Sequence, residues 1–314
     1  MTAIPYLGLM AATFVILAWS ADRFVDAAGT LALRLGMPLV LVGLVIVGFG
    51  TSAPEILVSA LAALSDNTGL AVGNALGSNI ANIALILGLA ALLVPLTTTF
   101  AAIRLEYLAL LIATLGLIPL LLDRHLGRLE GALLLILLAG ILVLFVLRAR
   151  GDGRTPVTAL PAGGRTGPTL GWLAVSLCLL LLSAHLLVWA ATALARMAGV
   201  SDLVIGLSIV ALGTSLPELA TSIAAVRKRQ FGMVLGNILG SNLFNILAVL
   251  GTAVLITPTT LASGPLVRDY GLMTALTLLL GVLLLWRGSV GRVAAAFLVL
   301  LYVSYQATLF LYHL

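Results

Sequence analysis

Charged residues, histidine and cysteine are scarce in this chain of 314 residues. Only 9% of the residues are Asp, Glu, Lys or Arg, three are histidines and one is a cysteine. The single cysteine, Cys178, excludes an intrachain disulfide bond. The chain also has no nucleotide-binding motif, no nucleophile with an adjacent base and no set of soft metal ligands. We therefore expect neither an enzyme nor a bound cofactor.

Hydrophobic residues make up 62% of the chain, in long runs such as Leu133 to Leu147. Only helices and closed barrels satisfy their backbone groups in lipid, and these runs have the length of helices. The fold class predicted is an all-α polytopic membrane protein. The net charge of +5 comes mostly from arginines near the ends of apolar runs, which is typical of contacts with anionic lipid. The expected partner is the lipid bilayer, with no nucleic acid and no required protein partner.

Ten membrane spans fit the hydrophobic blocks. Their expected ranges are 5–33, 38–63, 71–95, 102–122, 129–148, 170–197, 202–226, 233–256, 267–286 and 292–312. Between the fifth and sixth spans, a stretch rich in Gly, Pro, Thr and Arg has the composition of a flexible linker. The predicted organisation is a first repeat over 1–148, a cytoplasmic linker over 149–168 and a second repeat over 169–314.

The two halves repeat one another at a constant offset of 163 residues. Gly-Thr-Ser-Ala-Pro-Glu at 50–55 recurs as Gly-Thr-Ser-Leu-Pro-Glu at 213–218. Residues 69–88 and 232–251 are identical at eleven of twenty positions, which indicates internal duplication. Because each half holds five spans, an odd number, the second half must enter the membrane in the opposite orientation. The sequence therefore predicts two inverted five-helix repeats, an arrangement typical of transporters.

Basic residues predict how the chain is oriented in the membrane. If the linker is cytoplasmic, twelve of the sixteen lysines and arginines fall on the inner side. The outer side keeps only Arg124, Arg128, Arg196 and Arg268. Because cytoplasmic loops carry the excess of basic residues, we expect both termini outside.

Two of the four glutamates, Glu55 and Glu218, lie inside predicted spans at matched positions. An ionised acid at the centre of a membrane helix costs about 2.5–3.5 kcal/mol on insertion scales, so these side chains need compensation. Pro54 and Pro217 precede them and lack a backbone N–H, which frees a carbonyl oxygen one turn earlier. Carbonyl and carboxylate oxygens are ligands for hard cations. We expect the two glutamates to face each other across a cation site near the bilayer midplane.

A second repeated motif, Gly-Asn-x-Leu-Gly-Ser-Asn, occupies 73–79 and 236–242. Each copy leads to a hydroxyl and an amide four residues apart on one helical face, Ser78 with Asn82 and Ser241 with Asn245. Ser52 and Ser215 share a face with the glutamates, three residues before each. This all-oxygen set favours sodium, potassium or calcium over zinc or copper.

Other matched polar or small residues are expected to serve structure. The glycines at four-residue spacing let helices approach closely. A structural hydrogen bond is expected for each of Asn74, Asn79, Asn237 and Asn242. The matched pair Asp22 and His185 is expected to be interfacial or to face a cavity, with a functional pair as the alternative.

These motifs resemble the alpha repeats of the cation/calcium antiporter superfamily, and the nearest branch is the prokaryotic sodium/calcium exchanger. The resemblance covers essentially the whole chain and rests on four motifs in order at fixed spacing. It implies a ten-helix inverted-repeat exchanger in a prokaryotic plasma (inner) membrane. It also implies that the first and sixth spans slide across a core of the other eight.

The resemblance further implies a role for each matched residue. Glu55 and Glu218 would bind calcium together with carbonyl oxygens around Gly48, Thr51, Ala211 and Thr214. Ser52 and Ser78 would frame one sodium site, Ser215 and Ser241 its mirror image, and Asn82 and Asn245 would lie in the middle. Many relatives carry aspartate at the position of Asn245, so potassium co-transport and the stoichiometry are left open.

The function expected is secondary antiport, in which calcium leaves the cytoplasm in exchange for sodium by alternating access. The only bound ions expected are the transported sodium and calcium. The alternatives within the class are a proton/calcium exchanger and a potassium-dependent exchanger. A cation channel and a structural membrane protein are the alternatives from other classes.

Overall fold

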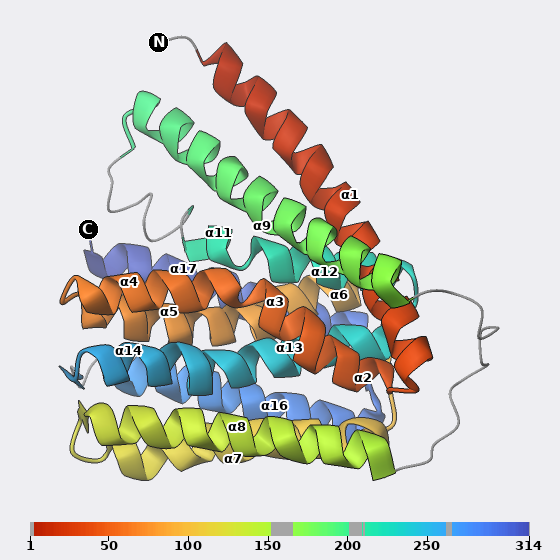
Figure 1. The fold of residues 1–314 in the computed structure, drawn as a ribbon. Coiled ribbons are helices and arrows are strands. Elements are labelled where there is room, and N and C mark those ends of the chain that lie inside the picture. Colours follow the sequence, from red (N-terminus) through yellow and green to blue (C-terminus); the bar gives the residue numbers. More distant parts are fainter. Residues whose placement is uncertain (1–2, 152–165, 201–208, 210, 262–265, 314) are drawn as a thin grey trace.

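The computed structural model describes residues 3–151, 166–200, 209, 211–261 and 266–313. Almost all of them are helical, and two long helices, α1 and α9, run side by side obliquely across the remaining helices (Figure 1). The first half comprises α1 (Ile4–Leu35), α2 (Leu39–Val42), η1 (Gly43–Gly48), α3 (Phe49–Thr51), α4 (Ala53–Leu64), α5 (Thr68–Ile80), η2 (Ala81–Leu87), α6 (Gly88–Leu93), β1 (Leu96–Thr97), α7 (Phe100–Leu121), β2 (His125–Leu126) and α8 (Arg128–Gly151). The second half comprises α9 (Thr166–Met197), α11 (Ala211–Thr214), α12 (Leu216–Arg227), α13 (Phe231–Phe244), η4 (Asn245–Val249), α14 (Leu250–Ile256), β3 (Thr259–Thr260), η5 (Leu266–Tyr270), α16 (Gly271–Arg287), β4 (Ser289–Val290) and α17 (Arg292–His313).

Eight described helices are long and apolar enough to cross a membrane, and a ninth span results if the bent pair Leu39–Thr51 and Ala53–Leu64 counts as one. Their ends lie within a few residues of the expected ranges. The expected span over 202–226 falls partly outside the described residues, and its described remainder forms α11 and α12. The described chain therefore matches nine of the ten expected spans.

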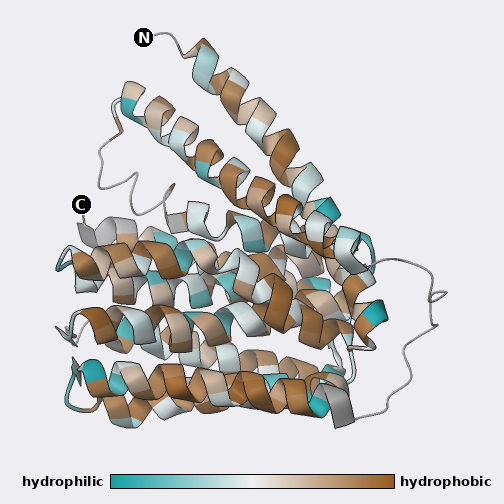
Figure 2. Cartoon of the chain, viewed as in Figure 1, coloured by the Kyte–Doolittle hydropathy of each residue, from teal (hydrophilic) through white to brown (hydrophobic). Residues whose placement is uncertain are grey.

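The outer surface of the bundle is apolar along most of the helices, and hydrophilic residues gather at helix ends (Figure 2). Large side chains such as Trp286 and Val293 are 85% and 84% exposed. Water would penalise so much exposed apolar surface, whereas hydrocarbon does not. The helices are therefore built to face lipid.

The centre of the bundle is formed by two matched spans. Of the most apolar windows of Thr68–Leu93 and Phe231–Ile256, 72% and 89% of the residues are buried, far more than in any other described span. Both are alanine-rich or glycine-rich, which lets neighbouring helices approach closely. These two spans therefore form the core on which the other helices pack.

Two short antiparallel pairs accompany the helices, which an all-α expectation did not include. β1 pairs with β4, and β2 pairs with β3, so each pair joins a strand of the first half to one of the second. The strands are only two residues long because they are the extended ends of loops between helices. The pairs lie at opposite ends of α7, which connects β1 to β2.

Both Pro-Glu spans are broken at a serine. Ser52 (φ −81°, ψ 4°) separates α3 from α4, and the helices on either side differ in direction by 43°. Ser215 (φ −89°, ψ 6°) separates α11 from α12 in the same way. Each proline lies in the first turn of the following helix, where its missing N–H is tolerated. The break therefore falls where the proline pattern predicts it.

Candidate functional site

Glu55 and Glu218 each lie in the first turn of the helix that follows a break, α4 and α12 respectively. Their side chains are 1% and 2% exposed, and their charges lie near enough to interact. A carboxylate at a helix N-terminus is favoured by the helix dipole. The breaks therefore bring two buried acids together and orient both at a helix start.

Hydrogen bonds connect the two halves around these acids. The Ser52 hydroxyl, from the first half, donates to Oε1 of Glu218 in the second half at 3.1 Å. Thr51 and Ser241 also approach the Glu218 carboxylate. Thr51 is fully buried and donates to the Val47 carbonyl oxygen at 2.9 Å, within its own helical segment. The site is therefore assembled from both halves of the chain.

An asparagine holds the turn that carries each glutamate. In the first half, Nδ2 of Asn74 donates to the Glu55 carbonyl oxygen at 3.2 Å and to the Ser59 hydroxyl at 2.9 Å. These bonds join α4 to α5. The sequence analysis expected a structural hydrogen bond at Asn74, and the geometry has this form.

The second half repeats this clamp at the same offset. Nδ2 of Asn237 donates to the Glu218 carbonyl oxygen at 3.4 Å and to the Ser222 hydroxyl at 3.0 Å, joining α12 to α13. Sequence reasoning missed Ser222 and its counterpart in the first half. Their identity at the constant offset is the signal that could have found them.

Asn82 and Asn245 lie in π-helical turns, which the sequence analysis did not predict. Asn82 is the second residue of η2, and Asn245 begins η4. π-Helical turns are widened and occur frequently at functional sites. Nδ2 of Asn82 donates to Oδ1 of Asn242 at 3.0 Å, which is a second polar contact between the halves.

Buried oxygens without hydrogen-bond partners are concentrated at the expected site residues. In the described part of the chain, seven such side-chain oxygens belong to Glu55 (Oε1 and Oε2), Glu218 (Oε2), Ser215, Ser241, Asn82 and Asn245. Leaving buried oxygens unpaired is costly, and each needs an explanation. The described residues contain no group of three or more His, Cys, Asp or Glu that could hold a metal. What the site offers is two carboxylates surrounded by hydroxyl and amide oxygens, which suits a hard cation.

The remaining expected residues lie around the same place. Ser78 is buried in α5, and Gly48 ends η1 against α13, where a Cβ would lie 3.1 Å from the Ser241 nitrogen. Thr214 is half-buried at the end of α11. Ala211 begins that helix, and its side chain lies outside the described set. Their roles as ion ligands stay predictions.

Asp22 and His185 do not form a pair within the described structure. Asp22 and Asp26, on α1, bind the Lys228 ammonium at 3.0 and 2.7 Å. Lys228 follows the last residue of α12. His185 is exposed on α9. The matched position therefore has an ion pair in one half only.

Comparison with known proteins identifies a family for the whole chain. The family model for the sodium/calcium exchanger protein matches twice, at residues 5–147 and 168–311. The Putative antiporter CaxA of Alkalimonas amylolytica is 42% identical over 308 residues, which cover 94% of this chain and 96% of the relative. Inner membrane protein YrbG of Escherichia coli strain K12 is 38% identical over 297 residues, 92% of this chain and 89% of the relative.

A solved structure has the same fold. The sodium-calcium exchanger NCX_Mj, soaked with 10 mM Na+ and zero Ca2+, matches with a TM-score of 0.86 and 29% sequence identity. The match covers 98% of this chain and 100% of that one. Together with the repeated acidic breaks and the lipid-facing helices, these matches show that the chain is an integral membrane protein of the sodium/calcium exchanger family, within the cation/calcium antiporter superfamily.

Proposed function

We propose that this protein exchanges sodium for calcium across the membrane by alternating access. The observation that carries the proposal is the group of seven buried, unpaired oxygens around Glu55 and Glu218, where the two halves of the chain meet. Two carboxylates give the site two negative charges, which one calcium ion would neutralise. Sodium ions would compete for the same hydroxyl and amide oxygens. The twelve residues named from the sequence are the proposed ligands and their immediate neighbours.

Competition between the ions supplies a physical basis for exchange. An empty site would hold two buried like charges that repel, so that state is unfavourable. Occupation by either cation removes the repulsion and favours crossing between the two access states. We therefore propose that calcium leaves the cytoplasm when sodium enters. Exchange coupled to protons or potassium is the alternative because Asn245 adds no third acid.

The proposed architecture is two inverted repeats, over 1–148 and 169–314, joined by a cytoplasmic linker with both chain termini outside. The short strand pairs support it, since β1 and β3 are separated by the repeat offset and each pairs with a strand of the other half at opposite ends of α7. The end of α8 and the start of α9 lie on the same side of the bundle (Figure 1). That side carries the excess of basic residues, so a prokaryotic plasma membrane with the linker inside is proposed.

Matched glycines in the two core spans support an outward-facing state. Gly236 and Gly240 of α13 are buried, and a Cβ at Gly240 would lie 2.6 Å from the Leu44 carbonyl oxygen of η1. Their counterparts in α5, Gly73 and Gly77, are exposed and half-buried. In the proposed orientation, the tight contact lies on the cytoplasmic side and the open face on the outer side. Alternating access would reverse this difference.

Ion gradients across proteoliposomes test the proposed coupling. Vesicles with the purified protein are loaded with sodium, potassium or a proton gradient, and uptake of external radioactive calcium is measured. We expect uptake to follow the sodium gradient and to stall when no counter-ion is present on the opposite side. Calcium flux that is indifferent to sodium would reject this coupling. Flux that continues without any counter-ion would indicate a channel.

Lys228 predicts a preference between the two access states. Its ion pairs with Asp22 and Asp26 tie the oblique helix α1 to the core helix α12 on the proposed cytoplasmic side. The matched position in the first half is Ser65, so no equivalent pair can form there. Because these groups are partly exposed, we expect Lys228→Gln to change the ratio of outer to inner apparent calcium affinity by only about two- to fivefold.

Sidedness measurements in vesicles of known orientation check this expectation. Lys228→Arg should keep the wild-type ratio because it keeps the charge. Arg227→Gln removes a neighbouring exposed charge and should have no effect on the ratio. An unchanged ratio in Lys228→Gln would mean that α1 does not separate from α12 during transport.

A further inference from the structure

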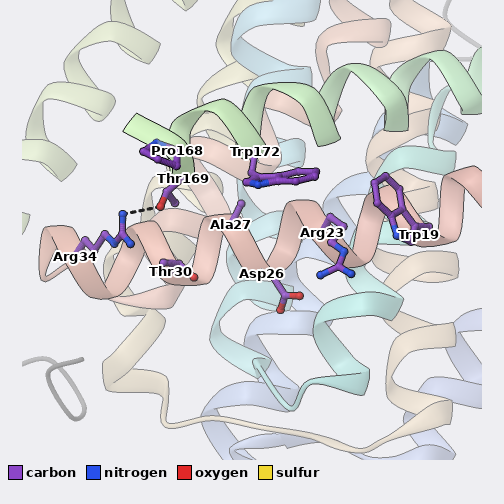
Figure 3. A pocket seen from close by; sticks show the side chains of 9 residues that line it. All are labelled: Trp19, Arg23, Asp26, Ala27, Thr30, Arg34, Pro168, Thr169 and Trp172. Carbon is purple, nitrogen blue, oxygen red and sulfur yellow. Dashed lines mark hydrogen bonds between the residues drawn. The ribbon is translucent and has the colours of Figure 1, made fainter. Parts of the chain in front are cut away.

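A pocket of about 540 Å³ lies between α1 and the start of α9, and none of the proposed cation ligands lines it (Figure 3). The residues that matter for its chemistry are Trp19, Arg23, Thr30 and Arg34 of α1, with Thr169 and Trp172 of α9. The α1 residues recur every three to four positions, so they share one helical face. The pocket is therefore a continuous strip along that face, covered on one side by α9.

The pocket has an excess of positive charge and of hydrogen-bond donors. Arg34 donates to the Thr169 hydroxyl at 2.6 Å. The one acidic residue in the lining, Asp26, binds Lys228 at 2.7 Å and points away from the tryptophans in Figure 3. Arg23 lies 5.8 Å from the centre of the Trp19 ring and has no ion pair among the described residues. A ligand with anionic oxygens would complement this lining.

The surroundings of the pocket are those of a lipid interface. Trp19 and Trp172 are 43% and 54% exposed, on helices whose other exposed side chains are apolar. Tryptophan is enriched where hydrocarbon meets headgroups. Arg34 is in the last turn of α1, at the linker side, whereas Arg23 lies three turns deeper in a predicted span. An exposed arginine at that depth is unfavourable in hydrocarbon unless an anion accompanies it.

We propose that this pocket binds an anionic phospholipid, with its phosphodiester held by Arg23 and Arg34 and its acyl chains beside Trp19 and Trp172. The planar guanidinium groups suit the paired oxygens of a phosphate. A soluble phosphate ester shares the headgroup chemistry, but it would leave the two exposed tryptophans without an apolar partner. The lipid is therefore the occupant that uses both the cationic and the aromatic part of the lining. The proposal does not depend on which ions the protein exchanges.

Retention of lipid by the purified full-length protein tests the site. The protein in detergent is incubated with equal amounts of phosphatidylglycerol and phosphatidylcholine, and bound lipid is counted by native mass spectrometry. We expect one retained phosphatidylglycerol per chain and a preference of roughly tenfold or more, the size expected for two arginines at an anionic headgroup. Arg23→Gln with Arg34→Gln should lower the preference to less than about twofold.

Two further double variants separate the site from general surface charge. Arg23→Lys with Arg34→Lys should retain most of the preference because it keeps both charges, and it provides a readout if the glutamine variant does not fold. Arg148→Gln with Arg287→Gln removes two exposed charges from the same proposed side, outside the pocket, and should retain the preference in full. Equal retention of the two lipids by the wild type, or an equal loss in the control variant, would overturn the proposal. Displacement of the lipid by excess sn-glycerol 3-phosphate would assign the pocket to a soluble phosphate and overturn it as well.

Discussion

Replacing either buried glutamate by glutamine is expected to lower sodium-driven calcium uptake by at least about 100-fold. Glu55→Gln and Glu218→Gln each keep the size of the side chain but remove half of the negative charge of the site. Loss of one partner from a buried charge pair typically costs about 2–5 kcal/mol, and each 1.4 kcal/mol is tenfold in affinity. Initial rates of calcium uptake in proteoliposomes at fixed protein density measure the loss.

Glu130→Gln is the matched control for these variants. Glu130 lies near the start of α8, where its Oε2 accepts a hydrogen bond from the Gly127 nitrogen at 2.8 Å, and it is remote from the α4 and α12 breaks in sequence and in hydrogen bonding. Its replacement should change uptake by less than about twofold, since a single peripheral hydrogen bond contributes little. Normal calcium uptake by either Glu55→Gln or Glu218→Gln would show that the acids serve structure alone.

The acidic breaks could be located from the sequence because they violate the rules of a membrane helix. An acid and a proline share one turn in an otherwise apolar span, and the same violation recurs 163 residues later. A defect that occurs twice at matched positions is not accidental, so the pattern predicts that both acids lie together. The structure places both side chains in buried first turns and joins the halves through Ser52 and Glu218. The span boundaries were also predictable, since hydrocarbon thickness sets helix length.

The π-helical turns could not be predicted in this way. η2 and η4 have the same apolar composition as the α-helices around them, and their wider turns depend on which partners Asn82 and Asn245 meet across the bundle. The strand pairs are a similar case, because two-residue strands have no periodicity of their own. Hydropathy measures transfer into lipid, so it carries no information on contacts among buried polar groups.

Difference between the repeats is the other property that the sequence conceals. Gly73 and Gly236 are the same residue in the same motif at the same offset. A Cβ at Gly236 would overlap the Val40 carbonyl oxygen, which belongs to helix backbone and cannot move aside, whereas no described atom lies within 4 Å of a Cβ at Gly73. An inverted duplication allows one arrangement at each side of the membrane in turn. Which side is closed is therefore a property of the conformation, and identical motifs cannot reveal it.

This difference predicts opposite outcomes for one substitution at two matched glycines. Gly236→Leu forces a branched side chain into backbone contact, so we expect almost no monodisperse protein in size-exclusion chromatography. Gly236→Ala should fold with an apparent Tm several degrees below the wild type, since overpacking of this kind costs about 1–3 kcal/mol. Gly73→Leu should fold at wild-type yield because its site is exposed in this state. Leucine is a good helix former at both positions, so the comparison isolates packing from helix propensity.

Transport by the folded variant then tests alternating access itself. If the outer side closes as the inner side does here, a leucine at position 73 would meet the backbone that packs against α5 in the other state. Gly73→Leu should therefore keep the wild-type Tm and yet exchange calcium more than about tenfold more slowly, since the blocked state would be disfavoured by more than 1.4 kcal/mol. Wild-type exchange by Gly73→Leu would contradict closure on the outer side. A loss of yield equal to that of Gly236→Leu would contradict the difference between the two repeats.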